Sequence, residues 1–196
     1  MGRVEARERI LRAAVRTLAR HGYARTSARA IARTGGFAPG VIYYHFADLD
    51  DLFAATAHYT SQARLARYRS ELDGVTSAVE LLRRLRGLYA EDGADGHIAA
   101  VQELVAAASG APALAVQVRQ ETAAWQDFAA GVIERFLAGT PFAALAPVRE
   151  LAAAAVATYL GMEMVSHLDA DRARPDAMFD AAGPAAAMFD ALRPDP

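Results

Sequence analysis

The chain has 196 residues, of which 54% are hydrophobic and 22% charged, with a formal net charge of −2. It contains no cysteine, which excludes disulfides, thiolate metal sites and a cysteine nucleophile. No run approaches the roughly 18 consecutive apolar residues of a membrane span, and residues 1–20 lack the apolar core of a signal peptide. We therefore expect a globular, cytoplasmic protein that has no membrane partner.

The charge is unevenly distributed along the chain. Residues 1–50 hold nine arginines against four acidic residues, a net charge of +5, whereas the remainder carries −7. A basic end on an acidic body suggests that this end meets a polyanion. Solvated helix faces would produce the same imbalance, so charge alone leaves both interpretations open.

Hydrophobic residues recur at helical spacing through almost the whole chain. In the first part, helices are expected over about residues 4–20, 28–34 and 39–45, and a longer helix begins at Asp48 or Asp50. Three helices of the body are expected at about 77–91, 97–108 and 112–137, followed by two C-terminal helices at about 147–169 and 175–192. Strand signals are nearly absent, so the sequence predicts an all-α protein of about nine helices.

The second and third expected helices are short and joined by a glycine turn. Thr26 or Ser27 can cap the second helix, Gly35-Gly36 supplies the turn, and Pro39 suits the first position of the third helix. Two short helices joined in this way are typical of a helix-turn-helix. Residues Ile31, Phe37, Ile42 and Phe46 are expected to form the small core that holds the two helices together.

The residues of this segment closely resemble the DNA-binding segment of the TetR family. Residues 26–46 match in the Ile31-Ala32 pair, in Gly36 before Phe37, in Gly40 and in the ending Tyr43-Tyr44-His45-Phe46. The resemblance is specific over about residues 7–53. It implies a three-helix helix-turn-helix DNA-binding domain over residues 1–50, and a helical ligand-binding and dimerisation domain over residues 51–196.

Several residues of the segment are candidates for contact with double-stranded DNA. Gly40 lets the backbone approach DNA, Tyr43 and Tyr44 offer hydroxyls to phosphates, and Arg29 can reach a phosphate or a guanine edge. The full set of candidates is Arg3, Thr26, Ser27, Arg29, Ala38, Pro39, Gly40, Val41, Tyr43, Tyr44 and His45. For Tyr43, packing and DNA contact are about equally favoured.

Three positions depart from the family pattern. Ala38 stands where a capping Ser or Thr is usual, Pro39 where Lys or Arg is common, and Leu49 where a Lys often binds phosphate. The third helix therefore has no Arg, Lys, Asn or Gln for bidentate base contacts. We expect base recognition to depend on Arg29, on Val41 against a thymine methyl group, and on a minor-groove arm through Arg3.

The resemblance also implies a site for a small-molecule effector in the body. Pocket walls are largely apolar with a few polar groups, and the candidates are Tyr89, Glu103, Glu121, Trp125, Phe128 and Tyr159. Ordinary core packing would explain the same aromatic residues. Glu163 is the only acidic residue in the apolar run from Leu151 to Leu168, and it could meet a cationic ligand, pair with an arginine across a dimer, or face water.

Family members form two-fold dimers, and the two C-terminal helices have apolar faces suited to a four-helix bundle with a second copy. The expected interface residues are Leu151, Ala155, Met162, Val165, Met178, Phe179, Ala182, Met188 and Phe189. The alternative is that both helices belong to the core of a monomer.

Enzyme signatures are missing from the sequence. The five histidines have no metal-ligand spacing, and GxSxG, P-loop and GxGxxG motifs do not occur. We therefore expect no enzyme, no cofactor and no metal site. The favoured function is a ligand-responsive regulator, most often a repressor, that binds palindromic DNA as a homodimer. The alternatives are a constitutive DNA-binding protein, or a small-molecule-binding protein whose DNA-binding end is weakened by Ala38, Pro39 and Leu49.

Overall fold

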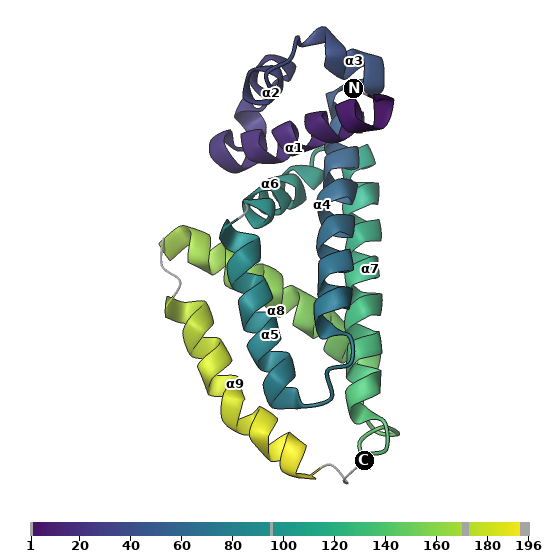
Figure 1. Ribbon diagram of the computed structural model, residues 1–196, viewed down its shortest axis with the longest axis vertical. Helices are drawn as coiled ribbons and strands as arrows, with labels where there is room; N and C mark the ends of the chain where they lie inside the picture. The colour runs from purple at the N-terminus through teal and green to yellow at the C-terminus, as the bar shows by residue number, and fades with distance from the viewer. Residues whose placement is uncertain (1, 95, 170–172, 193–196) are drawn as a thin grey trace. The chain divides into compact units, whose positions relative to one another are not determined.

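The computed structural model describes residues 2–94, 96–169 and 173–192, and within these ranges every regular element is a helix (Figure 1). The elements are α1 Arg3–His21, η1 Tyr23–Arg25, α2 Ala28–Gly35, α3 Gly40–His45, α4 Leu49–Leu72, α5 Ala78–Ala94, α6 His97–Ala108, α7 Pro112–Leu137, α8 Val148–Asp169 and α9 Ala173–Leu192. The predicted all-α architecture is confirmed, and the sequence missed only the single turn η1, a 3₁₀-helix. None of the helices in the described ranges is long and apolar enough to cross a membrane.

Contacts divide the chain into two compact units. The first comprises Met1–Arg64 with Asp92–Glu121, and the second comprises Leu65–Glu91 with Thr122–Pro196. The boundary passes through the long helices α4, α5 and α7, so each unit contains segments that are distant in the sequence. The predicted division at residue 50 separates a DNA-binding end from a body and stays a prediction.

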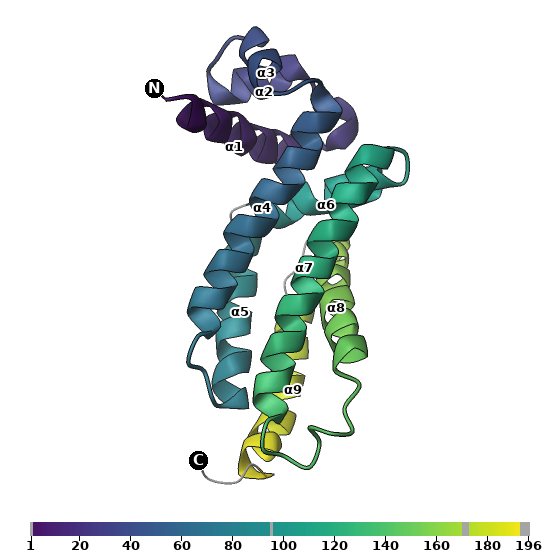
Figure 2. The ribbon, with the colours of Figure 1, turned by 90° about the vertical axis from the view of Figure 1, so that its right-hand side faces the viewer.

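The first unit has a continuous hydrophobic core. The buried stripe of α1 (Ile10, Leu11, Ala14, Val15 and Leu18) packs with Ile31 of α2, Ile42 of α3, Leu52 of α4 and Leu104 of α6. Figures 1 and 2 show α2 and α3 on one side of α1 and α6 on the other. Helix α1 is therefore the central element through which α2 and α3 are attached to the rest of the unit.

Polar contacts join α4 to the segment around α6 inside the same unit. Arg64 and Asp92 are almost fully buried, and the Arg64 Nη2 atom lies 2.8 Å from the Asp92 Oδ2 atom. The buried Thr60 hydroxyl lies 2.8 Å from Nδ1 of His97. Separating the two side chains would leave a buried charge without its partner, so this ion pair fixes α4 against the end of α5.

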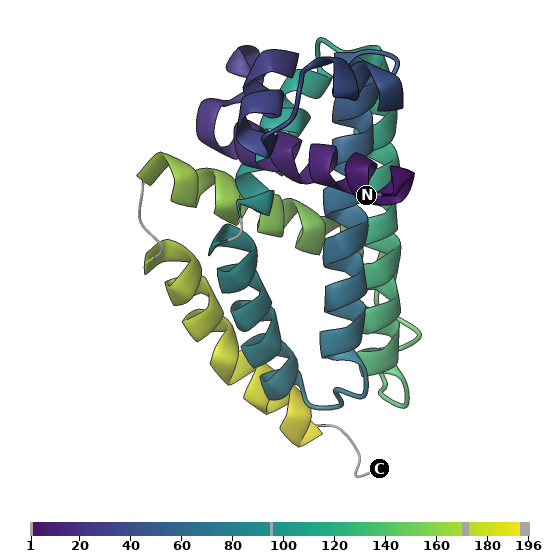
Figure 3. The same ribbon diagram turned by 45° about the horizontal axis from the view of Figure 1, so that its top comes forward.

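In the second unit, α9 lies beside α5 (Figure 3). Asp190 of α9 accepts hydrogen bonds from the Ser77 hydroxyl and from the backbone N–H groups of Ala78 and Val79, at 2.7, 2.7 and 3.0 Å. It thereby satisfies donors that the first turn of α5 leaves without helical partners. Further along α5, Arg86 binds two aspartates of α9, Asp176 and Asp180.

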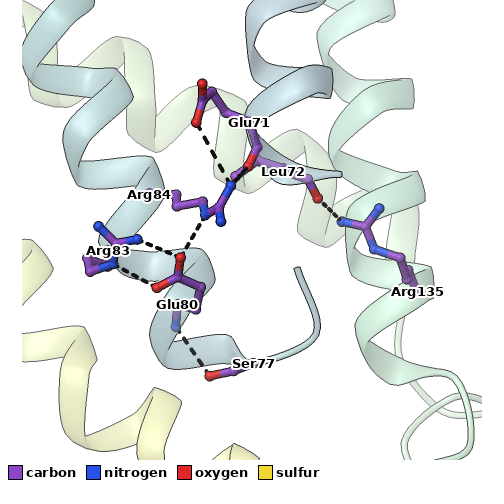
Figure 4. A network of polar contacts seen from close by, with 7 residues as sticks. All are labelled: Glu71, Leu72, Ser77, Glu80, Arg83, Arg84 and Arg135. Carbon is purple, nitrogen blue, oxygen red and sulfur yellow. Dashed lines mark hydrogen bonds and ion pairs between the residues drawn. The ribbon is translucent and has the colours of Figure 1, made fainter. Parts of the chain in front are cut away.

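The connection from α4 to α5 is held by arginines (Figure 4). Arg135 of α7 donates to the carbonyl of Leu72 at 2.9 Å, and Arg84 of α5 donates to the carbonyl of Glu71 at 2.5 Å. Glu80 binds both Arg83 and Arg84, and their hydrogen bonds lower its pKa to about 2. These contacts satisfy carbonyls in the last turn of α4, where helical partners are missing.

Candidate nucleic-acid interface

The turn between α2 and α3 is built by short-range contacts. Ser27 caps α2, its hydroxyl accepting from the Ala30 N–H at 3.3 Å, and the buried Thr26 donates to the carbonyl of Gly22 at 2.7 Å. Gly36 ends α2 in the left-handed conformation with φ +66°. A Cβ atom at Gly35 would lie 2.1 Å from the Phe37 ring, so only glycine fits there.

Arg9 of α1 holds this turn from outside. Its guanidinium donates to the carbonyl of Gly35 from Nε at 3.0 Å and from Nη2 at 2.7 Å, and to the carbonyl of Gly36 from Nη2 at 2.8 Å. It also lies over the Phe37 ring. Arg9 was not among the candidates, because an arginine on a helix face carries no sign in the sequence that it reaches a turn 26 residues away.

The inner face of α3 belongs to the core. Ile42 and Phe46 are buried, and Phe37 and Val41 pack against the same cluster. The expectation that Ile31, Phe37, Ile42 and Phe46 fix the two helices is confirmed. Val41 is half-buried, so only part of its side chain is available for a thymine methyl group.

The outer face of α3 is exposed and carries Tyr43 and Tyr44, two of the predicted DNA contacts. Tyr43 is 56% exposed and Tyr44 72%. His45 is half-buried and packs edge-on against Tyr44, with ring centroids 5.1 Å apart. Five further candidates are exposed: Ser27, Arg29, Ala38, Pro39 and Gly40. Thr26 is buried and its hydroxyl is used internally, so it positions α2.

Arg3 is also exposed but does not extend as an arm. It is the first residue of α1, and its guanidinium lies 6.0 Å from the centre of the Tyr44 ring. Helical geometry at this position places Arg3 beside the outer face of α3. Arg3 is therefore a cation next to the exposed Tyr44, and its contact with the minor groove stays a prediction.

Helix α4 begins beside this surface with a reciprocal cap. The Asp48 carboxylate accepts from the Asp51 N–H at 2.8 Å, and Asp51 accepts from the Ala47 N–H at 3.0 Å. This confirms Asp48 as a start signal of the helix. Leu49 packs against the hydrophobic core. The position where a lysine often binds phosphate is therefore used for packing in this chain.

Comparison with known proteins agrees with this geometry. Residues 10–56 match the family model described as bacterial regulatory proteins of the tetR family. A putative TetR-family regulator from Rhodococcus sp. is 25% identical and superposes with a TM-score of 0.76 over 97% of this chain and 100% of the other. Residues 10–56 are therefore a regulatory segment of the TetR family, and the whole chain has the fold of TetR-family regulators.

Two further proteins are similar to this chain, one in sequence and one in fold. The chain is 27% identical over 124 residues to the HTH-type transcriptional regulator UidR of Escherichia coli K12, a match that covers 63% of this chain and 62% of UidR. A TetR-family regulator from Agrobacterium tumefaciens shares the fold, with 20% identity, a TM-score of 0.75 and coverage of 98% and 100%. The family model and both of these proteins are described as regulators.

Two of the predicted effector contacts have structural partners in the first unit. Glu103 of α6 accepts a hydrogen bond from the Tyr23 N–H at 2.6 Å and lies against Gly22. It therefore connects α6 to the segment between α1 and α2. Glu121 of α7 is buried and binds His58 at 2.7 Å, and it also accepts from Gln62 at 3.2 Å and Gln117 at 2.5 Å.

The other four candidates lie in the second unit, in two clusters of aromatic rings. Trp125 and Phe128 of α7 pack edge-on against Tyr68 of α4, with centroids 5.0 and 6.4 Å from its ring. Tyr89 of α5 contacts Tyr159 of α8 and Phe179 of α9 in the same manner. Tyr68 and Phe179 were not among the effector candidates, although both are aromatic residues at helical spacing.

Glu163 is 7% exposed, which removes the alternative that it faces water. It lies four residues after Tyr159 on α8, and therefore on the same face of that helix.

The Glu121 site predicts how stability depends on pH. Burial by itself raises the pKa of Glu121, but hydrogen bonds from His58, Ser61, Gln62 and Gln117 outweigh it and hold the pKa below the ordinary 4.5. A carboxyl with a lowered pKa stabilises the fold fully above its ordinary pKa and loses this contribution as pH falls through the folded value.

We expect urea unfolding between pH 6 and pH 3 to show a smaller loss of stability in Glu121→Gln than in the wild type. Glu134→Gln, an exposed change on the same helix, is the control, and a pH profile of Glu121→Gln equal to that of the wild type would contradict the prediction.

Proposed function

We propose that this TetR protein is a repressor that binds palindromic operator DNA as a homodimer in the cytoplasm and is released by a small molecule. The match to UidR spans 62% of the length of that relative, so the action of the whole protein is part of the proposal. The observation that carries it is the outer face of α3. Tyr43 and Tyr44 stand exposed there on a helix whose inner face is locked into the core.

The proposed DNA-binding domain is residues 1–50, with contacts from Arg3, Ser27, Arg29, Gly40, Tyr43, Tyr44 and His45. The two tyrosine hydroxyls would bind phosphates, and the bare backbone at Gly40 would lie close to DNA. A Cβ atom at Gly40 would meet nothing within 4 Å, so the space beside Gly40 is open to the sugar-phosphate backbone of DNA. Arg29, exposed in the first turn of α2, is the best candidate for a bidentate contact with guanine.

The proposed dimer uses α8 and α9. Leu151 is 44% exposed, Met178 48% and Met188 63%, and Met164 and Leu192 add further exposed apolar surface. Ala155 is exposed, whereas Met162, Val165, Phe179, Ala182 and Phe189 are partly buried. Extended apolar surface of this kind marks a contact site, and a two-fold axis would let two recognition helices meet successive major grooves about 34–36 Å apart.

The proposed effector site lies in the body, residues 51–196, with the rings of Tyr89, Trp125, Phe128 and Tyr159 as candidate contacts. Glu103 and Glu121 are better explained as supports within the first unit, since their carboxylates already accept hydrogen bonds. Release would follow from linkage: an effector that prefers a conformation unsuited to the operator lowers DNA affinity by its differential affinity for the two conformations. A coupling of about 1–3 kcal/mol gives roughly 5- to 150-fold relief.

The test is selection of a binding site from a random DNA library, followed by titration with purified protein. We expect a palindromic site that binds two protomers, in a complex that resists non-specific competitor and weakens with salt.

Arg29→Ala should lose about 1–3 kcal/mol of operator affinity and relax specificity at one position in each half-site. Arg69→Ala, an exposed change in α4 with the same loss of charge, should leave specificity unchanged. Failure to select any sequence would refute the proposed function, and an Arg29→Ala protein with unaltered specificity would refute the role of Arg29.

A further inference from the structure

The proposed DNA-binding domain, residues 1–50, carries exposed arginines besides Arg3 and Arg29. Arg16 and Arg20 lie one helical turn apart on the exposed side of α1, Arg25 follows in η1, and Arg33 is exposed in the last turn of α2. These four residues are here called the arginine patch. We propose that the arginine patch binds phosphates of DNA outside the half-site that α3 contacts. This inference rests on the proposed function, because that function assigns the half-site to α3.

Two residues of the patch, Arg16 and Arg33, lie beside the contact between α1 and α2. The Thr17 hydroxyl donates to the Thr34 hydroxyl at 3.0 Å, which joins the two helices at this point. Arg16 and Arg33 each directly precede one of these threonines, so both arginines border the same helix crossing. Positive charge from two elements is therefore held together by the fold.

The other arginines of α1 have local roles that Arg16, Arg20 and Arg33 lack. Arg9 holds the turn, Arg12 pairs with Glu8 at 3.0 Å, and Arg7 lies over the Phe46 ring. Arg16, Arg20 and Arg33 make no ion pair within the described residues, and the Nε of Arg25 donates to the carbonyl of His21. The exposed guanidinium groups of Arg16, Arg20 and Arg33 fix no part of the described fold, and they are suited to a partner that supplies anionic oxygens.

The distance of the arginine patch from α3 determines which phosphates of the DNA the patch can reach. Arg3 and Arg7 place the N-terminal half of α1 beside the C-terminal end of α3, through Tyr44 and Phe46. From Arg7 to Arg20 the axis of α1 advances by roughly 20 Å, at about 1.5 Å per residue. This length corresponds to roughly six nucleotides of a DNA strand at about 3.4 Å each, and it exceeds a Debye length of about 8–10 Å. The patch would therefore neutralise phosphates other than those under α3.

The experiment compares salt dependence on duplexes of two lengths. Fluorescence anisotropy would measure affinity from 50 to 200 mM NaCl for a short duplex limited to the selected operator and for a long duplex with mixed-sequence flanks on both sides. The test variant is Arg16→Gln/Arg20→Gln, which changes the two patch residues of α1. The matched control, Arg69→Gln/Arg149→Gln, removes the same charge from exposed positions of the second unit. Circular dichroism checks that both variants keep the helical content and melting curve of the wild type.

On the long duplex, the slope of log K against log[salt] should fall in magnitude by about 1–2 in the test variant, since each neutralised phosphate contributes about 0.9. The short duplex and the control variant should keep the wild-type slope. Equal slopes for wild type and test variant on the long duplex would overturn the proposal. An equal fall on both duplexes would overturn it too, because the patch would then belong to the operator contact. In both cases specific binding by the wild type would leave the proposed function standing.

Discussion

Replacing Asp92 with alanine is expected to lower the free energy of unfolding by about 3–5 kcal/mol, because it leaves the charge of Arg64 buried and uncompensated. Arg64 is 6% exposed and Asp92 0%. Two guanidinium atoms of Arg64, Nε and Nη2, lie 2.9 and 2.8 Å from the same carboxylate oxygen. The measurement is urea denaturation followed by circular dichroism, with the m-value compared to confirm that the same surface unfolds.

Two controls test whether the loss of stability comes from the unpaired buried charge of Arg64. Arg64→Met/Asp92→Leu removes both charges and should be much less destabilising than Asp92→Ala, since no unpaired charge remains. Arg83→Ala breaks an exposed ion pair with Glu80 and should be much less destabilising than Asp92→Ala. A loss of under about 1 kcal/mol in Asp92→Ala would show that the buried pair does not hold α4 in place.

The second large effect is expected at the turn between α2 and α3. In Gly35→Ala the new methyl group would lie 2.1 Å from Cε1 of Phe37 and 2.9 Å from Cβ of Ala13, so Phe37 must leave its place. Overpacking of this kind costs about 1–3 kcal/mol. Because Phe37 and the Arg9 contacts set the position of α3, operator affinity should fall by at least about tenfold, a loss of roughly 1.4 kcal/mol.

Gly40→Ala is the matched control for the turn. Its methyl group would meet nothing within 4 Å, and an alanine is at least as favourable as glycine in a helix. We expect unchanged or slightly higher stability together with weaker operator binding, because the methyl group stands where the backbone would approach DNA. Thermal melting and the operator titration measure the two properties separately. Wild-type stability and affinity in Gly35→Ala would refute this account of the turn.

The charged residues that join helices of the first unit could not be predicted from the sequence. Glu103 was expected to line an effector site, but its carboxylate binds the N–H of Tyr23, 80 residues earlier. Arg9 and the Arg64–Asp92 pair were not singled out at all. A charged residue on an amphipathic helix looks the same in sequence whether it faces water or a buried partner. The partner is chosen by how distant helices pack, and periodicity does not contain that information.

The sequence by itself determined the all-α class, helix bounds close to those observed, and the helix-turn-helix with its core residues Ile31, Phe37, Ile42 and Phe46. These features follow from local rules: apolar spacing, capping side chains, and glycines where a turn leaves no room for Cβ. Only the tertiary structure decided that Thr26 is buried, that Arg3 lies on α1 beside Tyr44, and that Glu163 is inside. Burial and polar pairing depend on which helix faces meet, and such contacts join residues that no local pattern relates.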